Sequence, residues 1–96
     1  MGATTFSVTF PGKTAKEAFA AARTDAQYQH GHGGYSGTIA EKNDFVMIKL
    51  PDGVDPRAYA NQLIECQDER IDDKWGPAGC IALPNGKFLF FGWASE

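Results

Sequence analysis

Apolar residues in the first part of the chain recur with two different periods, and each period predicts a different element. Between residues 5 and 10 every second position is apolar, which predicts a half-buried β-strand with Phe6, Val8 and Phe10 on its inner face. After Pro11-Gly12, Thr14 and Glu17 form a capping-box pattern that begins a helix running to about residue 30. The apolar stripe of this helix consists mostly of small residues: Ala15, Ala18, Phe19, Ala22 and Ala26.

The helix that ends near residue 30 is followed by two predicted strands, and the second half of the chain repeats this order of one helix and two strands. Strands are expected at residues 35–40 and 45–50, joined as a hairpin. A second helix begins at Pro56 behind the N-cap Asp55 and fades near residues 69–71. A second hairpin joins residues 78–83 and 87–93 through Asn85-Gly86.

The predicted order is therefore β-αββ-αββ. It favours an α+β fold in two layers, an antiparallel sheet of about five strands with both helices on one face. A shift of 42 residues lays residues 37–40 on residues 79–82. This similarity is explained either by an internal duplication of an αββ unit or by chance resemblance of two similar units.

The length and the net charge of the chain exclude several classes of function. A chain of 96 residues fits one domain, residues 1–96. Twelve acidic against nine basic side chains give a net charge of -3, which argues against binding to duplex nucleic acid or to an anionic membrane. The N-terminus has no signal-peptide pattern, and Cys66 and Cys80 show no CxxC spacing, so we expect reduced thiols and a cytoplasmic protein.

Two glycine-rich loops are the candidate binding site, because each leads from a helix into a strand and loops concentrate binding groups. Their glycines follow a helix instead of preceding one, so neither loop is a P-loop or a dinucleotide fingerprint. The predicted ligand-binding residues, which hold a polar small ligand or contact a protein, are His30, His32, Gly33, Gly34, Tyr35, Ser36, Thr38, Trp75 and Cys80. A purely conformational role for the first loop is the alternative.

Catalytic and metal roles are open alternatives for the same loops. A zinc site would need His30 and His32 to converge with Cys80 or an acidic residue. A nucleophile pair of Cys80 and His32 is also conceivable, although a cysteine that alternates with Ile81 in a strand is more often a small buried residue. We therefore assign no catalytic residue, no metal and no cofactor.

The last strand is apolar on both of its faces. Because two helices on one sheet face would leave the other face open, Leu89, Phe91 and Trp93 are expected to form an exposed patch. A homodimer through this patch is the favoured prediction. A partner or ligand surface, or cover by Trp75 and the loops of the same chain, are the alternatives.

Three segments resemble short proteins of unknown role that are encoded by tailed bacteriophages. The segments are HGHGGYSGTIAEK (residues 30–42), DKWGPAGC (residues 73–80) and FFGW (residues 90–93). The resemblance transfers no catalytic residue. It implies an accessory protein in the host cytoplasm that blocks a host or defence protein or sequesters a small nucleotide-like ligand.

The sequence therefore favours a non-enzymatic binding protein that inhibits or sequesters a host component through its glycine-rich loops. Two other functions stay open. One is a small hydrolase or transferase that uses His32 as its base. The other is a structural or assembly component.

Overall fold

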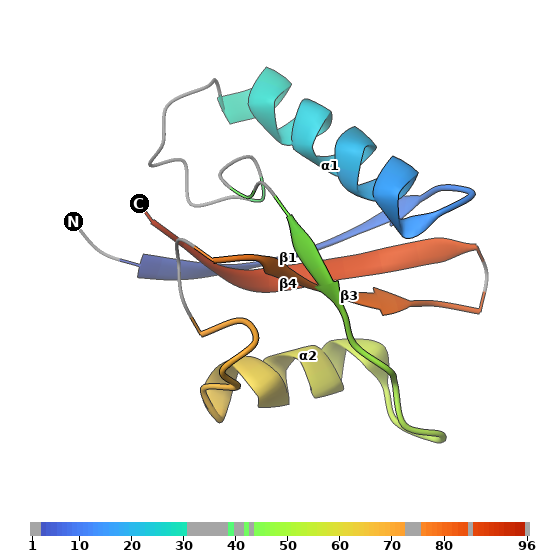
Figure 1. The fold of residues 1–96 in the computed structure, drawn as a ribbon, viewed down its shortest axis with the longest axis vertical. Helices are drawn as coiled ribbons and strands as arrows, with labels where there is room; N and C mark the ends of the chain where they lie inside the picture. Colours follow the sequence, from blue (N-terminus) through green and yellow to red (C-terminus); the bar gives the residue numbers. More distant parts are fainter. Residues whose placement is uncertain are drawn as a thin grey trace.

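Helices lie on both sides of a single sheet (Figure 1). The computed structural model describes residues 3–30, 39, 42, 44–72, 76–84 and 86–95. In chain order its elements are β1 (Ala3–Pro11), α1 (Ala15–His30), β2 (Phe45–Met47), α2 (Pro56–Glu65), β3 (Ala78–Ala82) and β4 (Lys87–Ser95). This arrangement confirms the α+β class, whereas the layering and the sheet differ from the prediction.

The sheet has the strand order β1-β4-β3-β2. β1 pairs antiparallel with β4 along its whole length, from Ala3 opposite Ser95 to Pro11 opposite Lys87. β3 and β4 form the predicted antiparallel hairpin, and Gly86 adopts the positive φ, 80°, that favours glycine in such a turn.

The expectation of an antiparallel sheet of about five strands is wrong. The described residues form four strands, and β2 runs parallel to β3 with Phe45 opposite Ala78. The reason is the crossover through α2, which brings the chain back in the same direction. Of the strand expected at residues 35–40, Ile39 alone lies within the described residues, and it belongs to a short 3₁₀ turn in which the Lys42 amide donates to the Ile39 carbonyl (2.9 Å).

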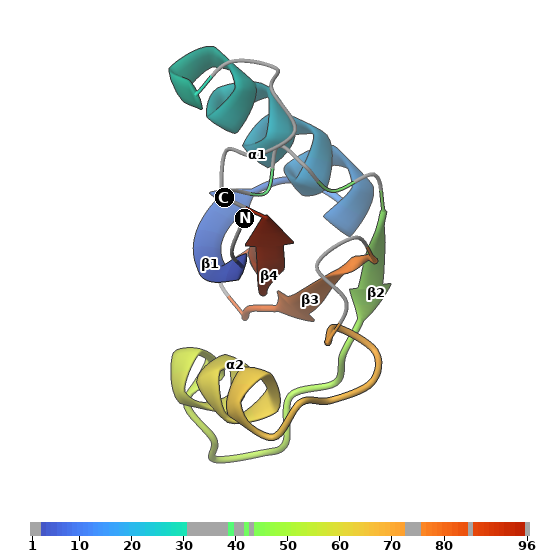
Figure 2. The same cartoon turned by 90° about the vertical axis from the view of Figure 1, so that its left-hand side faces the viewer.

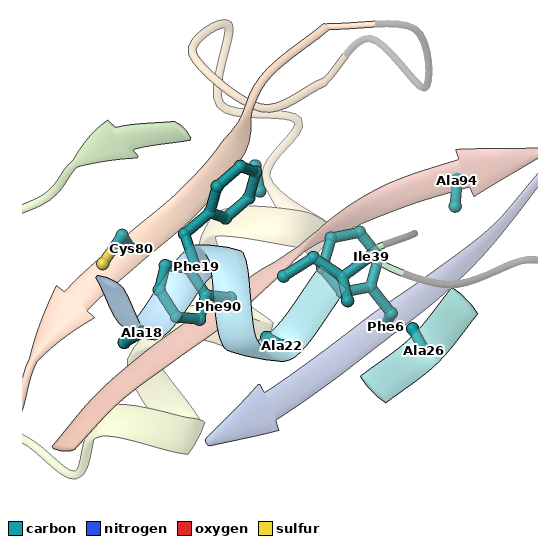
Figure 3. Close-up of a cluster of buried hydrophobic side chains, with 10 residues drawn as sticks. Phe6, Ala18, Phe19, Ala22, Ala26, Ile39, Cys80, Phe90 and Ala94 are labelled. Atoms are coloured by element: carbon teal, nitrogen blue, oxygen red, sulfur yellow. The ribbon is translucent and has the colours of Figure 1, made fainter. Parts of the chain in front are cut away.

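α1 is capped and buried much as its sequence predicts. The Glu17 amide donates to Thr14 Oγ1 (3.2 Å), while the Glu17 carboxylate accepts from the Lys13 amide (3.3 Å) one residue before the expected position. The small residues of the predicted stripe are buried except Ala15, which is partly buried, and Phe19 packs against Phe90 with ring centroids 5.5 Å apart (Figure 3). The small side chains bring α1 close to the sheet.

α2 begins at the predicted cap and ends earlier than predicted. Asp55 Oδ2 accepts a hydrogen bond from the Ala58 amide (3.0 Å), and Pro56 occupies the first turn. The helix ends at Glu65, where the Cys66 amide donates to the Gln62 carbonyl (2.9 Å) and Gln67 takes a left-handed φ of 57°.

The two helices cover opposite faces of the sheet (Figure 2), so the prediction of a two-layer fold with both helices on one face is wrong. The physical reason is the alternation of β4. Phe90 and Ala94 belong to the apolar cluster beneath α1, whereas Leu89 and Phe91 belong to the cluster beneath α2. β4 is a central strand with a helix on each side.

This layering removes the basis of the predicted dimer surface. Leu89 and Phe91 are 1% and 0% exposed, because α2 of the same chain covers them. Trp93 packs at the margin of that cluster and is partly buried. The exposed patch that a dimer through these three residues requires is therefore not formed by the described part of the chain.

Gly79 allows β3 to lie directly against the Phe91 ring. A Cβ atom at Gly79 would lie 2.6 Å from Phe91 Cζ, which is far inside van der Waals contact. Phe91, the partner of Gly79 across the β3–β4 pair, therefore leaves no space for a side chain at position 79.

We predict that Gly79→Ala lowers the free energy of unfolding by about 1–3 kcal/mol, because the added methyl overpacks a filled core. Chemical denaturation followed by circular dichroism measures the effect. The matched control is the same substitution in a Phe91→Leu background, where the outer ring atoms are gone and the penalty should shrink. An equal penalty in both backgrounds would contradict the assigned contact.

Candidate functional site

The two glycine-rich loops lead into neighbouring strands at the same end of the sheet. β2 and β3 are parallel, and the first residue of β2, Phe45, lies opposite the first residue of β3, Ala78. The Ala78 amide also donates to the Asp44 carbonyl (3.0 Å), which extends the pairing toward both loops. The residues at which the two loops rejoin the sheet are therefore in direct contact.

A buried lysine reinforces this junction. Lys42, just before β2, is 1% exposed, and its Nζ donates to the carbonyl oxygen of Gly76 (2.9 Å), just before β3. A buried ammonium group is costly unless it is hydrogen-bonded, so this contact fixes the geometry between the two segments. Ile39, 1% exposed in the core beneath α1, anchors the same stretch of chain.

Sequence reasoning missed Lys42. Residues 41–44 have turn chemistry, and a lysine in a polar turn is normally exposed. Its burial comes from a contact with Gly76, 34 residues away, and no local pattern carries that information.

Most of the predicted ligand-binding residues lie outside the part of the chain that the structure describes: His32, Gly33, Gly34, Tyr35, Ser36, Thr38 and Trp75. His30 is the last residue of α1. The structure thus brings together the strand ends that carry these loops, and the binding residues themselves stay a prediction.

Cys80 differs from the other candidates, because it lies in the core. It is 0% exposed in β3 and belongs to the apolar cluster beneath α1, together with Phe90 and Ala18 (Figure 3). Burial raises the pKa of its thiol to about 12, so the thiol stays protonated near neutral pH. A protonated, inaccessible thiol is neither a nucleophile nor a surface contact, so Cys80 does not serve the predicted site.

An open groove of about 480 Å³ lies between the C-terminal part of α2 and the paired strands β1 and β4. It is lined by Thr5, Asn61, Ile64, Glu65, Gln67 and Trp93. The indole N–H of Trp93 is buried and finds no hydrogen-bond partner among the described residues. The groove combines amides, a carboxylate and an indole, and sequence reasoning did not group these residues because they come from three separate segments.

No metal centre emerges from the described residues, among which no group of three or more His, Cys, Asp and Glu side chains is placed to hold an ion. The second histidine of the predicted pair, His32, lies outside them. None of the helices that the structure describes is both long and apolar enough to cross a membrane.

Comparisons with protein-family models, with curated proteins and with solved structures gave no match to this chain.

The buried lysine gives a direct prediction for stability. Lys42→Met keeps the apolar stem but removes the donor to Gly76, and we expect it to lower the free energy of unfolding by about 1.5–3 kcal/mol, the usual cost of losing a hydrogen bond from a charged group. Thermal or urea denaturation measures the change. Lys87→Met, at an exposed position of β4, is the matched control and should change stability by no more than about 0.5 kcal/mol. Equal effects of the two substitutions would contradict the structural role of Lys42.

Proposed function

We propose that this protein is a small non-enzymatic binding protein whose contact surface is formed by the two glycine-rich loops, residues 30–38 and 75–77. In this proposal it acts as a phage-type accessory protein in the host cytoplasm. It inhibits or sequesters a host or defence component, either a protein or a small nucleotide-like ligand.

The observation that carries the proposal is the junction between the two loops. The hydrogen bond from Lys42 Nζ to the Gly76 carbonyl (2.9 Å) and the parallel start of β2 and β3 tie both loops to one end of the sheet. Loops that project from a common rigid base are suited to form one continuous binding surface. This supports a site that uses both loops together.

The chemistry of the loop residues favours recognition by contact over catalysis. Tyr35 and Trp75 offer aromatic faces for stacking, and Ser36 and the glycine amides offer hydrogen bonds. The alternative in which His32 activates Cys80 loses support, because the Cys80 thiol is buried and its pKa is raised to about 12. A binding function needs no reactive group of this kind.

The test compares the wild-type protein with Tyr35→Ala/Trp75→Ala after purification of both from bacterial cytoplasm. We expect native mass spectrometry to find an additional mass on the wild type, either several hundred daltons for a small ligand or the mass of a protein other than this chain. The double variant should lose this mass while its melting temperature stays nearly unchanged. Met47→Ala removes a large, 51% exposed side chain from β2, and it is the matched control that should retain the mass.

Two results would contradict the proposal. One is an additional mass that the double variant retains, since the ligand would then bind elsewhere. The other is a wild-type protein that carries neither a ligand nor a protein partner.

A further inference from the structure

β1 forms one edge of the sheet, and of the features that usually protect such an edge it has only the proline at its last residue, Pro11. It is nine residues long, and no described residue pairs with it on the side away from β4. Exposed edge strands are usually short, or carry lysine or proline that prevents pairing with another chain. Residues 3–10 contain no charged residue and no proline, so nothing in their sequence opposes such pairing.

A hollow between β1 and α1 follows the same edge. One part, about 210 Å³, is lined on the β1 side by Phe6, Val8 and Phe10, and the adjoining part, about 590 Å³, extends along α1 past Ala20 and Ala21 to Tyr28. Phe10 and Asp25 line both parts, so the two hollows adjoin each other, and we refer to them together as the groove. Tyr28 is 90% exposed, an unusual degree for a large aromatic residue on a helix.

We propose that this surface, which we call the β1 edge, pairs with the β1 edge of a second copy of the chain. The two β1 strands run antiparallel and join two four-stranded sheets into one continuous sheet. The two α1 helices then lie side by side over the new seam. This surface is distinct from the Leu89, Phe91 and Trp93 face, which α2 covers.

The β1 edge is self-complementary, which is the argument for a second copy as the occupant. In an antiparallel pair, the side chains of both strands alternate in the same way between the two faces. In the pair, the α1 side of each β1 strand therefore carries Phe6, Val8 and Phe10. These side chains would lie next to the groove of the other copy, which is lined by the same three residues. A twofold interface requires this kind of match between a surface and itself.

Size and charge are compatible with such a dimer. The eight residues 3–10 span about 27 Å at about 3.4 Å each. The smaller stable interfaces bury about 600 Å² per copy, so a strip of this length needs a width of about 20 Å, which the edge of β1 and the adjoining side of α1 would have to supply together. Asp25 is the single charged residue lining the groove, and its carboxylate already accepts a hydrogen bond from Gln29 Nε2 (3.0 Å). Small residues at positions 20 and 21 let the two helices approach closely.

Analytical ultracentrifugation tests the proposal. The wild-type protein should sediment with twice the 10.4 kDa mass of the chain. Ser7→Lys places like charges near each other at the middle of the paired strands, and Tyr28→Glu places a charge on α1, so each variant should give a folded monomer. Met47→Lys is the matched control, since Met47 is 51% exposed on β2 at the opposite edge, and it should stay dimeric.

Hydrogen exchange keeps the test decisive if Ser7→Lys fails to fold. In the wild-type protein, the β1 amides that point away from β4 should be protected at high concentration and should exchange faster on dilution. A wild-type monomer at tens of micromolar would overturn the proposal. A dimer that Met47→Lys dissociates and Tyr28→Glu leaves intact would overturn it as well, because the second copy would then occupy the β2 edge.

Discussion

The burial of both faces of β4 is the constraint on which the rest of the structure depends. Phe90 faces the cluster beneath α1, while Leu89 and Phe91 face the cluster beneath α2. A strand that is apolar on both sides needs cover on both sides, so the two helices must occupy opposite faces. β4 therefore lies between β1 and β3, where neighbouring strands satisfy both of its backbone edges.

The same constraint positions the candidate site. The chain from β2 to β3 crosses the face opposite α1 through α2, and a helical crossover of this kind returns the chain in its original direction, so β2 and β3 are parallel. Parallel neighbours begin at the same end of the sheet, and this is where Lys42 bonds to the carbonyl of Gly76. The convergence of the two loops thus follows from the crossover through α2, the helix that covers the second face of β4.

Local patterns predicted the elements well and their arrangement poorly. Alternation identified β1, the caps Thr14 and Asp55 placed both helix starts, and Asn85-Gly86 identified the hairpin. The period of a helix shows which of its sides is apolar but not which face of the sheet it covers. With both helices expected on one face, the second apolar face of β4 lacked cover, and a dimer was predicted to supply it. Lys42 was beyond prediction for a related reason, because its burial arises from a contact between segments that are distant in sequence.

The most direct test of the three-layer arrangement is the thermal unfolding of Phe91→Glu, with Ala82→Glu at an exposed position of β3 as its control. A carboxylate at the fully buried position 91 has no room and no solvent beneath α2. We expect Phe91→Glu to lose its cooperative unfolding transition, while Ala82→Glu retains a melting temperature close to that of the wild type. A Phe91→Glu protein that folds with nearly unchanged stability would contradict the burial of β4 between the two helices.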